Sequence, residues 1–72
     1  MIDQSKMGIR CRTIHFLRTV EGDLPRNSQG TIRCEIENLD RRLIFVQWDQ
    51  GFTVPVFPHE IEVFAEAVDA RL

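Results

Sequence analysis

The sequence predicts an all-β domain built as a small antiparallel barrel. Between residues 30 and 63, short runs of alternating apolar and polar residues are separated by compact turn signals. This alternation is typical of strands that turn one face to a core and the other to water. Pro58 then favours a single helical turn before a last short strand, in which Ile61 and Val63 point inward.

Residues 9–20 predict a long first strand, because they are rich in β-branched and aromatic side chains and contain no helix cap. The alternation slips at Leu17, which predicts a bulge or a bend between His15 and Arg18. Residues 21–30 carry glycine, proline, aspartate, asparagine and serine, which is the composition of a loop. We expect either a variable surface loop or a binding edge there.

Three further strands bring the predicted barrel to five. Residues 31–37 alternate cleanly, residues 43–48 place Ile44, Val46 and Trp48 on a common face, and residues 52–57 follow a tight turn. Pro55 indicates that the last of these strands lies at a sheet edge or contains a bulge. The Trp48 N–H is expected to donate to a backbone carbonyl. The residues expected in the core are Phe16, Ile32, Cys34, Ile36, Ile44, Val46 and Trp48.

A length of 72 residues predicts one domain. We expect a flexible N-terminus over residues 1–7, the barrel over 8–64, and a short helical tail over 65–72 that either docks on the barrel or frays. The purely apolar runs are far too short to span a membrane, and no charged segment followed by an apolar one opens the chain. These features predict a cytoplasmic protein with no membrane partner.

No pattern in the sequence predicts catalysis, so we expect neither an enzyme nor a cofactor. The chain lacks the motifs of nucleophilic and phosphate-binding sites and contains no tyrosine. Cys11, Cys34 and the two histidines lack zinc-ligand spacing, which argues against a metal site and favours free thiols over a disulfide. His59 lies beside Glu60, and we interpret it as a packing or capping residue rather than half of an acid–base pair.

Several apolar residues remain for the outer surface once the inward positions are assigned. They exceed what a small monomer normally exposes in one patch. Three alternatives account for them: the C-terminal tail covers them, they form a surface for a partner or a second copy, or the register slips. These residues are Leu17, Leu43, Phe45 and Phe57.

Four short segments resemble those of SH3-like barrels found in electron-transport accessory proteins. They are residues 14–18 (IHFLR), 30–32 (GTI), 46–51 (VQWDQG) and 57–63 (FPHEIEV). Similar barrels occur in the small stromal subunit of photosystem I, the variable chain of ferredoxin-thioredoxin reductase and the β-subunit of nitrile hydratase. The resemblance implies a five-stranded SH3-like barrel with a one-turn helix before its last strand. It also implies a non-catalytic module that docks beside a redox or metabolic partner and holds no cofactor. Our leading hypothesis is a bacterial-type barrel of this kind.

We therefore expect a protein–protein interaction or accessory module, with a protein partner or a second copy of the chain on its surface. The residues expected to bind the partner are Leu17, Arg18, Arg26, Leu43, Phe45 and Phe57, with the 21–30 segment as the rim. The alternative is RNA or nucleoprotein binding through Arg10, Arg12, Arg33, Arg41 and Arg42. A net charge of −2 weighs against that alternative and favours pairing of these arginines with acidic neighbours.

Overall fold

The structure is a computed structural model that describes residues 2–64. The described residues form strands and one 3₁₀ turn, which confirms the predicted all-β class. The helical tail expected over 65–72 lies outside them. The elements are β1 (Ile2–Asp3), β2 (Arg10–Thr13), β3 (Leu17–Thr19), β4 (Gly22–Leu24), β5 (Gln29–Asn38), β6 (Arg41–Trp48), β7 (Thr53–Val56), η1 (Pro58–Glu60) and β8 (Ile61–Val63).

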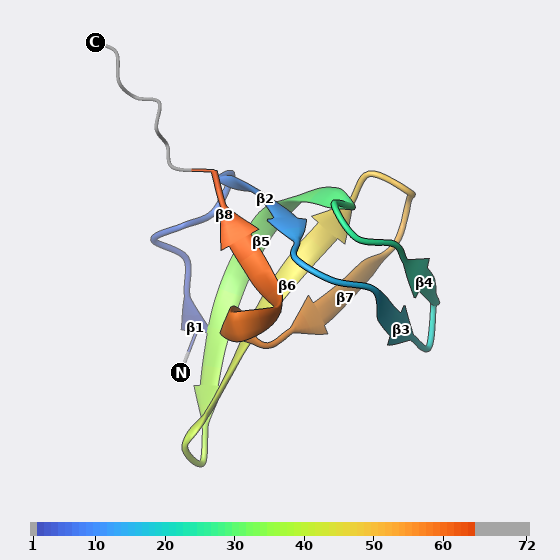
Figure 1. The fold of residues 1–72 in the computed structure, drawn as a ribbon. Helices are drawn as coiled ribbons and strands as arrows, with labels where there is room; N and C mark the ends of the chain where they lie inside the picture. The colour runs from blue at the N-terminus through green and yellow to red at the C-terminus, as the bar shows by residue number, and fades with distance from the viewer. Residues whose placement is uncertain (1, 65–72) are drawn as a thin grey trace, which may run out of the picture.

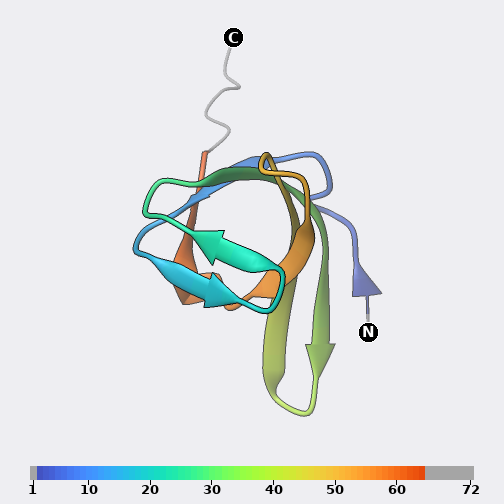
Figure 2. The same cartoon turned by 90° about the vertical axis from the view of Figure 1, so that its right-hand side faces the viewer.

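One antiparallel sheet contains β7, β6, β5, β2 and β8 in that order, and β1 pairs with the far end of β5. The sheet curls, and β5 and β6 form a long hairpin that projects beyond the other strands (Figure 1). β3 and β4 form a separate two-stranded ribbon that lies across the open side of the curled sheet (Figure 2). Within residues 2–64 no pairing joins β7 to β8 or to the ribbon, so the predicted five-stranded barrel is not closed.

The predicted first strand is divided into β2 and β3 by a bend at residues 14–16. A bend was expected here, and its position follows from Thr13, which is fully buried. The Thr13 hydroxyl donates to the carbonyl of Pro25 at 2.9 Å and accepts from the N–H of Ser28 at 3.0 Å. These bonds tie the end of β2 to the segment before β5, so the chain leaves the sheet immediately after Thr13.

A strand pair occupies part of the 21–30 segment, so the prediction of a continuous loop there is wrong. β4 pairs with β3, and Leu24 lies opposite Leu17. The Thr19 hydroxyl closes the turn by donating to the carbonyl of Gly22 at 2.6 Å. Leu24 is fully buried, and burial of such a side chain contributes about 2 kcal/mol. The turn-forming residues around Leu24 concealed its role, which is to hold the ribbon on the core together with Leu17.

A bulge at Arg33 reverses the alternation along β5. Ile32 lies opposite Val46, whereas Cys34 lies opposite the next residue back along β6, Phe45. Arg33 is thus an extra residue with no counterpart on β6. Because strand side chains alternate between the two faces, every residue after Arg33 lies on the face opposite to the one expected.

The bulge makes the prediction of Cys34 and Ile36 as core residues wrong. Both are only half-buried, while Glu35 between them is buried on the same side of the sheet as the core. Its carboxylate forms ion pairs with Lys6 Nζ at 3.3 Å and Arg42 Nε at 3.9 Å. These cations supply the charge compensation that a buried carboxylate requires.

The core lies between the curled sheet and the ribbon. Phe16 was expected inside and is 51% exposed, whereas Leu17 was expected outside and is 8% exposed. The bend before β3 causes this exchange. Trp48 is buried as predicted, but its Nε1 has no hydrogen-bond partner within residues 2–64. The buried apolar residues are Cys11, Leu17, Leu24, Ile32, Ile44, Val46, Trp48, Val54, Val56 and Ile61.

Candidate interaction surfaces

The strand register gathers apolar side chains on the face of the sheet that points away from the core. Ile36 lies opposite Leu43 on β6 and opposite Ile2 on β1. Phe45 lies opposite both Cys34 and Pro55. Directly opposed residues share a face of the sheet, so these two rows lie side by side. We call this surface the outer apolar face, and it consists of Ile2, Cys34, Ile36, Leu43, Phe45 and Pro55.

The outer apolar face is partly accessible to solvent. Ile2 is 65% exposed, Pro55 is exposed, and the other four members are half-buried. Phe57 follows two residues after Pro55 and has the same parity, so it extends the face beyond the end of β7. The Phe57 ring stacks on His59, with the ring centroids 5.8 Å apart. The contact joins two exposed side chains, and the interpretation of His59 as a packing or capping residue stays a prediction.

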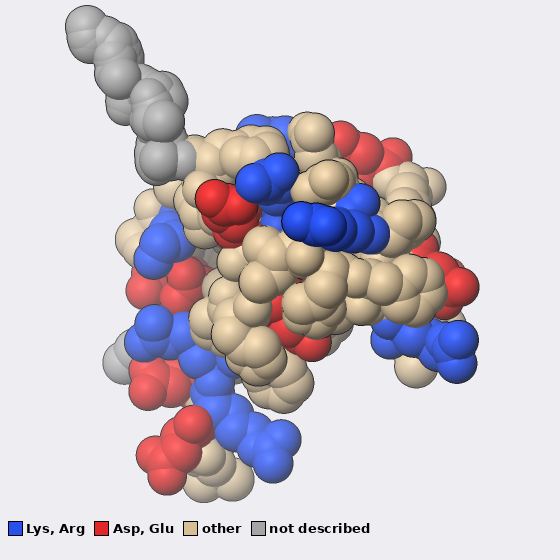
Figure 3. Space-filling model, viewed as in Figure 1, with Lys and Arg blue, Asp and Glu red and all other residues tan. Residues whose placement is uncertain are grey.

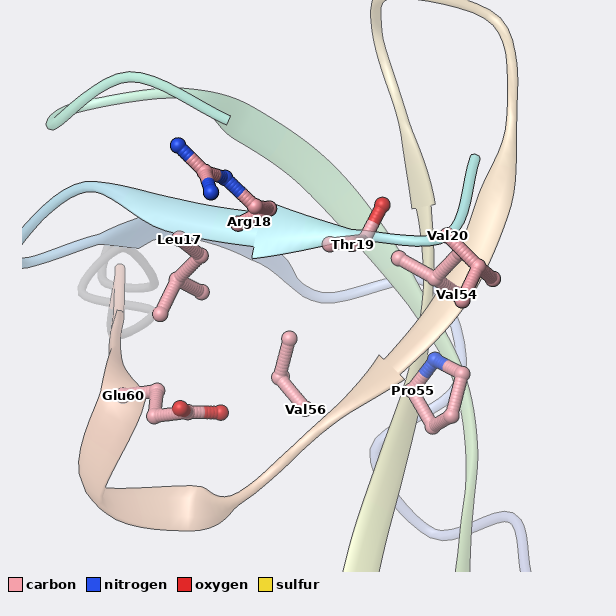
Figure 4. Close-up of a pocket in the computed structure, with 8 residues that line it drawn as sticks. All are labelled: Leu17, Arg18, Thr19, Val20, Val54, Pro55, Val56 and Glu60. Carbon is pink, nitrogen blue, oxygen red and sulfur yellow. The ribbon is translucent and has the colours of Figure 1, made fainter. Parts of the chain in front are cut away.

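A groove of about 300 Å³ lies between the ribbon and the edge of the sheet. Leu17 and Val56 reach into it from opposite walls, and the Glu60 carboxylate lies at one end (Figure 4). The Arg18 side chain points away from the groove on the other side of β3 (Figure 4). We call this the β3–β7 groove, and its lining residues are Leu17, Arg18, Thr19, Val20, Val54, Pro55, Val56 and Glu60.

Glu60 caps the 3₁₀ turn and contributes a charge to the groove. Its Oε1 accepts a hydrogen bond from the N–H of Phe57 at 2.8 Å, which satisfies a free donor at the start of the turn. Within residues 2–64 no lysine or arginine lies within ion-pair distance of this carboxylate, unlike Glu35 and Glu62. The groove therefore combines apolar walls with one uncompensated negative charge.

The arginines suggested for nucleic-acid binding are largely paired with acids. Arg10 forms two hydrogen bonds to Asp49, the shorter at 2.6 Å, and this contact raises the pKa of Arg10 and lowers that of Asp49. Arg12 pairs with Glu62 at 2.6 Å. Arg42 lies 3.9 Å from both Glu35 and Glu37.

Charges of both signs are interleaved over the face shown in Figure 3. Arg33 and Arg41 are exposed and have no ion-pair partner in the described part of the chain. Arg33 occupies the bulge and Arg41 begins β6. The five arginines thus do not form one continuous basic stripe.

The predicted partner-binding residues fall into two groups. Leu43, Phe45 and Phe57 lie on or beside the outer apolar face. Leu17 and Arg18 line the β3–β7 groove, and Leu17 is a buried wall residue rather than a surface anchor. Arg26 is exposed in the turn before β5 and belongs to neither surface.

Sequence reasoning missed part of each surface. Cys34 and Ile36 belong to the outer apolar face, but the bulge that moves them there has no local signal in the sequence. Val54 and Val56 were placed on a strand without a role, and they form a wall of the groove because the ribbon packs over them. The alternation of residues 52–57 predicted the strand, but it gave no indication that the ribbon packs against this strand.

The described residues contain little that supports metal or thiol chemistry. Residues 2–64 contain no cluster of three or more histidine, cysteine or acidic side chains that could hold a metal ion. Burial raises the pKa of the Cys11 thiol to about 11, so this group stays protonated and unreactive at neutral pH. Residues 2–64 also include no helix long and apolar enough to cross a membrane.

Comparison of the chain with protein-family models, with curated proteins and with solved structures found no match.

Proposed function

We propose that this protein is a non-catalytic interaction module that docks on a larger protein partner through its outer apolar face. The observation that carries the proposal is the register across three neighbouring strands. It places Phe45 between Cys34 and Pro55, in a row adjacent to Leu43 and Ile36. A contiguous apolar surface centred on an aromatic residue is typical of the energetic centre of a protein interface.

We also propose that the fold is an open SH3-like barrel. Two features of the structure support this proposal. Residues 30–32 (GTI) lie in β5 at the centre of the sheet, and the 3₁₀ turn η1 leads directly into the last strand, β8. These placements support the proposed barrel. The interaction role rests on the outer apolar face and does not depend on this assignment.

We do not extend the proposal to RNA binding. Affinity for nucleic acid depends on positive charge that is free to replace counterions along the phosphate backbone. Arg10, Arg12 and Arg42 already contact carboxylates of the same chain. Their pairing leaves Arg33 and Arg41 as the free members of the suggested set, which is a weak basis for such a site.

The test is capture of partners by tagged variants that differ in one apolar side chain. Phe45→Asp places a charge at the centre of the outer apolar face. Leu39→Asp is the matched control, because Leu39 is 87% exposed in the turn between β5 and β6 and belongs to neither surface. Circular dichroism and thermal unfolding would first show that both variants fold. The proposal expects proteins that the wild type and Leu39→Asp retain from native lysate and that Phe45→Asp does not.

Two results would contradict the proposal. Equal retention by all three proteins would remove the outer apolar face as the docking site. An unfolded Phe45→Asp protein would show that Phe45 is needed for the core. The gentler change Phe45→Ser would then decide whether binding and stability separate. Sedimentation at several concentrations would identify a second copy of the chain as the partner if Phe45→Asp abolished a concentration-dependent dimer.

A further inference from the structure

The β3–β7 groove is bordered by two strand edges that lack partners in the described residues. β7 pairs with β6 on one side only, and β3 pairs with β4 on one side only. Residues of both strands line the groove, so their free edges lie on its two walls. An unpaired edge presents backbone N–H and C=O groups that an added strand can bind.

The interior of the groove suits an apolar side chain. Leu17, Val54 and Val56 are buried or nearly so, and Leu17 and Val56 point toward each other across the space (Figure 4). A volume of about 300 Å³ lies at the lower end of the range for binding pockets. It has room for a few atoms of an extended chain and is too narrow for a second layer of secondary structure.

The negative charge of Glu60 restricts which polypeptide segments can bind in the groove. One oxygen of the Glu60 carboxylate binds the Phe57 N–H, and no basic group of residues 2–64 pairs with this side chain. The Arg18 side chain points away and does not neutralise it (Figure 4). A lysine or arginine carried by the occupant would supply the missing counter-charge and a charge-assisted hydrogen bond.

We propose that the β3–β7 groove binds an extended segment of a partner polypeptide, which adds as a strand between β3 and β7. The segment places an apolar side chain against Leu17 and Val56 and a basic side chain beside Glu60. This site shares only Pro55 with the outer apolar face, and the inference does not require docking there.

Pro55 makes recognition depend on side chains. Proline has no N–H, so the middle of β7 cannot donate to a neighbouring strand. An added strand therefore forms an incomplete ladder with β7 and draws its remaining backbone bonds from β3. The same proline limits unspecific pairing of β7 with other strand edges. The apolar contact and the contact with Glu60 then set the specificity.

The test begins with a phage-displayed library of random linear nine-residue peptides, selected against the full-length protein. Selected peptides should alternate apolar residues and carry lysine or arginine at a fixed position. In ¹⁵N NMR spectra, a synthetic peptide of this type should shift the amide signals of Arg18, Thr19, Val54 and Val56. Failure to select any binder, or shifts confined to the outer apolar face, would overturn the proposal.

One variant tests the role of Glu60, and two further variants serve as controls. Glu60→Gln keeps an amide oxygen that can accept from the Phe57 N–H, so the turn is retained while the charge is lost. It should bind the basic peptide about two- to fivefold more weakly, and salt should then have little further effect. Arg26→Gln removes a charge from the exposed turn before β5, which belongs to neither surface, and Phe45→Asp alters the outer apolar face. Both should bind as the wild type does.

Equal binding by Glu60→Gln and the wild type would remove the proposed counter-charge. A selected set without basic residues would have the same consequence. A protein that sediments as a dimer in which the groove residues are protected would assign the groove to a second copy of this chain, which would also overturn the proposal. If Phe45→Asp lost the interaction made by the outer apolar face but still bound the peptide, the two surfaces would be shown to bind independently.

Discussion

Cys34 lies directly opposite Phe45 on the outer apolar face, although Ile32, only two residues earlier, lies opposite Val46 in the core. The difference arises from Arg33, the extra residue of the bulge. Residues before Arg33 and residues after it therefore follow different alternations. The bulge thus places Cys34 and Ile36 on the outer apolar face instead of in the core.

Deletion of Arg33 should preserve the fold. With Arg33 removed, Ile32 and Cys34 become neighbours and their partners Val46 and Phe45 are already neighbours, so all the other pairs of β5 and β6 can remain. We expect a change in the free energy of unfolding of about 1 kcal/mol, which is typical of a single surface change. Urea denaturation and the amide NMR pattern of β6 would measure it.

Deletion of Glu35 is not a sufficient control for deletion of Arg33. The bulge can absorb this deletion too, because Ile36 and the residues after it keep their partners when Cys34 pairs with Ile44. A control without this possibility is deletion of Gln47, because β6 has no extra residue and the loss would move the buried Trp48 to the outer face. We expect the loss of several kcal/mol or an unfolded chain. If deletion of Arg33 and deletion of Gln47 proved equally harmful, the bulge would not be the cause of the altered register.

The extent of sequence prediction follows from the same bulge. β6 has no irregularity, so its alternation correctly placed Ile44, Val46 and Trp48 inside and Leu43 and Phe45 outside. Along β5 the apolar residues continue to alternate past Arg33 without interruption, so the sequence contains no sign of an extra residue. Only the pairing with β6 reveals it, and pairing is a property of two distant segments.

The ribbon was missed for a different physical reason. Residues 21–30 have the composition of turns, and a three-residue strand has too few positions to show a period. Its place is determined by Leu24 and Leu17, which enter the core together. The β3–β7 groove depends on this tertiary packing, so local propensity could not predict it.

Gly30→Ala should destabilise the protein more than its small size suggests. A Cβ at position 30 would lie 2.6 Å from Val46 Cγ1 and 2.9 Å from Trp48 Cε3, which is closer than atoms can pack without movement. Because both neighbours are buried, we expect a loss of about 1–3 kcal/mol, typical of overpacking. Thermal and urea unfolding would measure the loss.

Gly51→Ala provides the comparison for Gly30→Ala. Gly51 has open space around its Cα but a φ of +118°, so alanine there meets backbone strain without a packing clash. Its unfolding should show a loss that depends little on the size of the substituted side chain. Gly30→Val should be much worse than Gly30→Ala, whereas an unaffected Gly30→Ala protein would contradict the close packing of β5 on Trp48.

Asp49→Asn should reduce the dependence of stability on pH in acid. The hydrogen bonds from Arg10 lower the pKa of Asp49 in the folded protein below its ordinary value of 3.8. The ionised form therefore favours the folded state above the unfolded-state pKa, and this contribution is lost as the pH falls through the folded-state pKa. The free energy of unfolding of the variant should fall less steeply below about pH 4. Identical slopes for variant and wild type would show that the Arg10 contact contributes nothing to folding.

Chemical labelling should distinguish the two cysteines. Cys34 is half-buried on the outer apolar face, whereas Cys11 is fully buried, and burial raises the pKa of the Cys11 thiol to about 11. Alkylation follows the accessible thiolate, so iodoacetamide at pH 8 should modify Cys34 and leave Cys11 intact until the chain unfolds. Mass spectrometry of tryptic peptides would measure both rates. The Cys34→Ser protein should resist labelling in buffer and react in urea. Rapid modification of Cys11 in the folded protein would contradict its place in the core between β5 and β8.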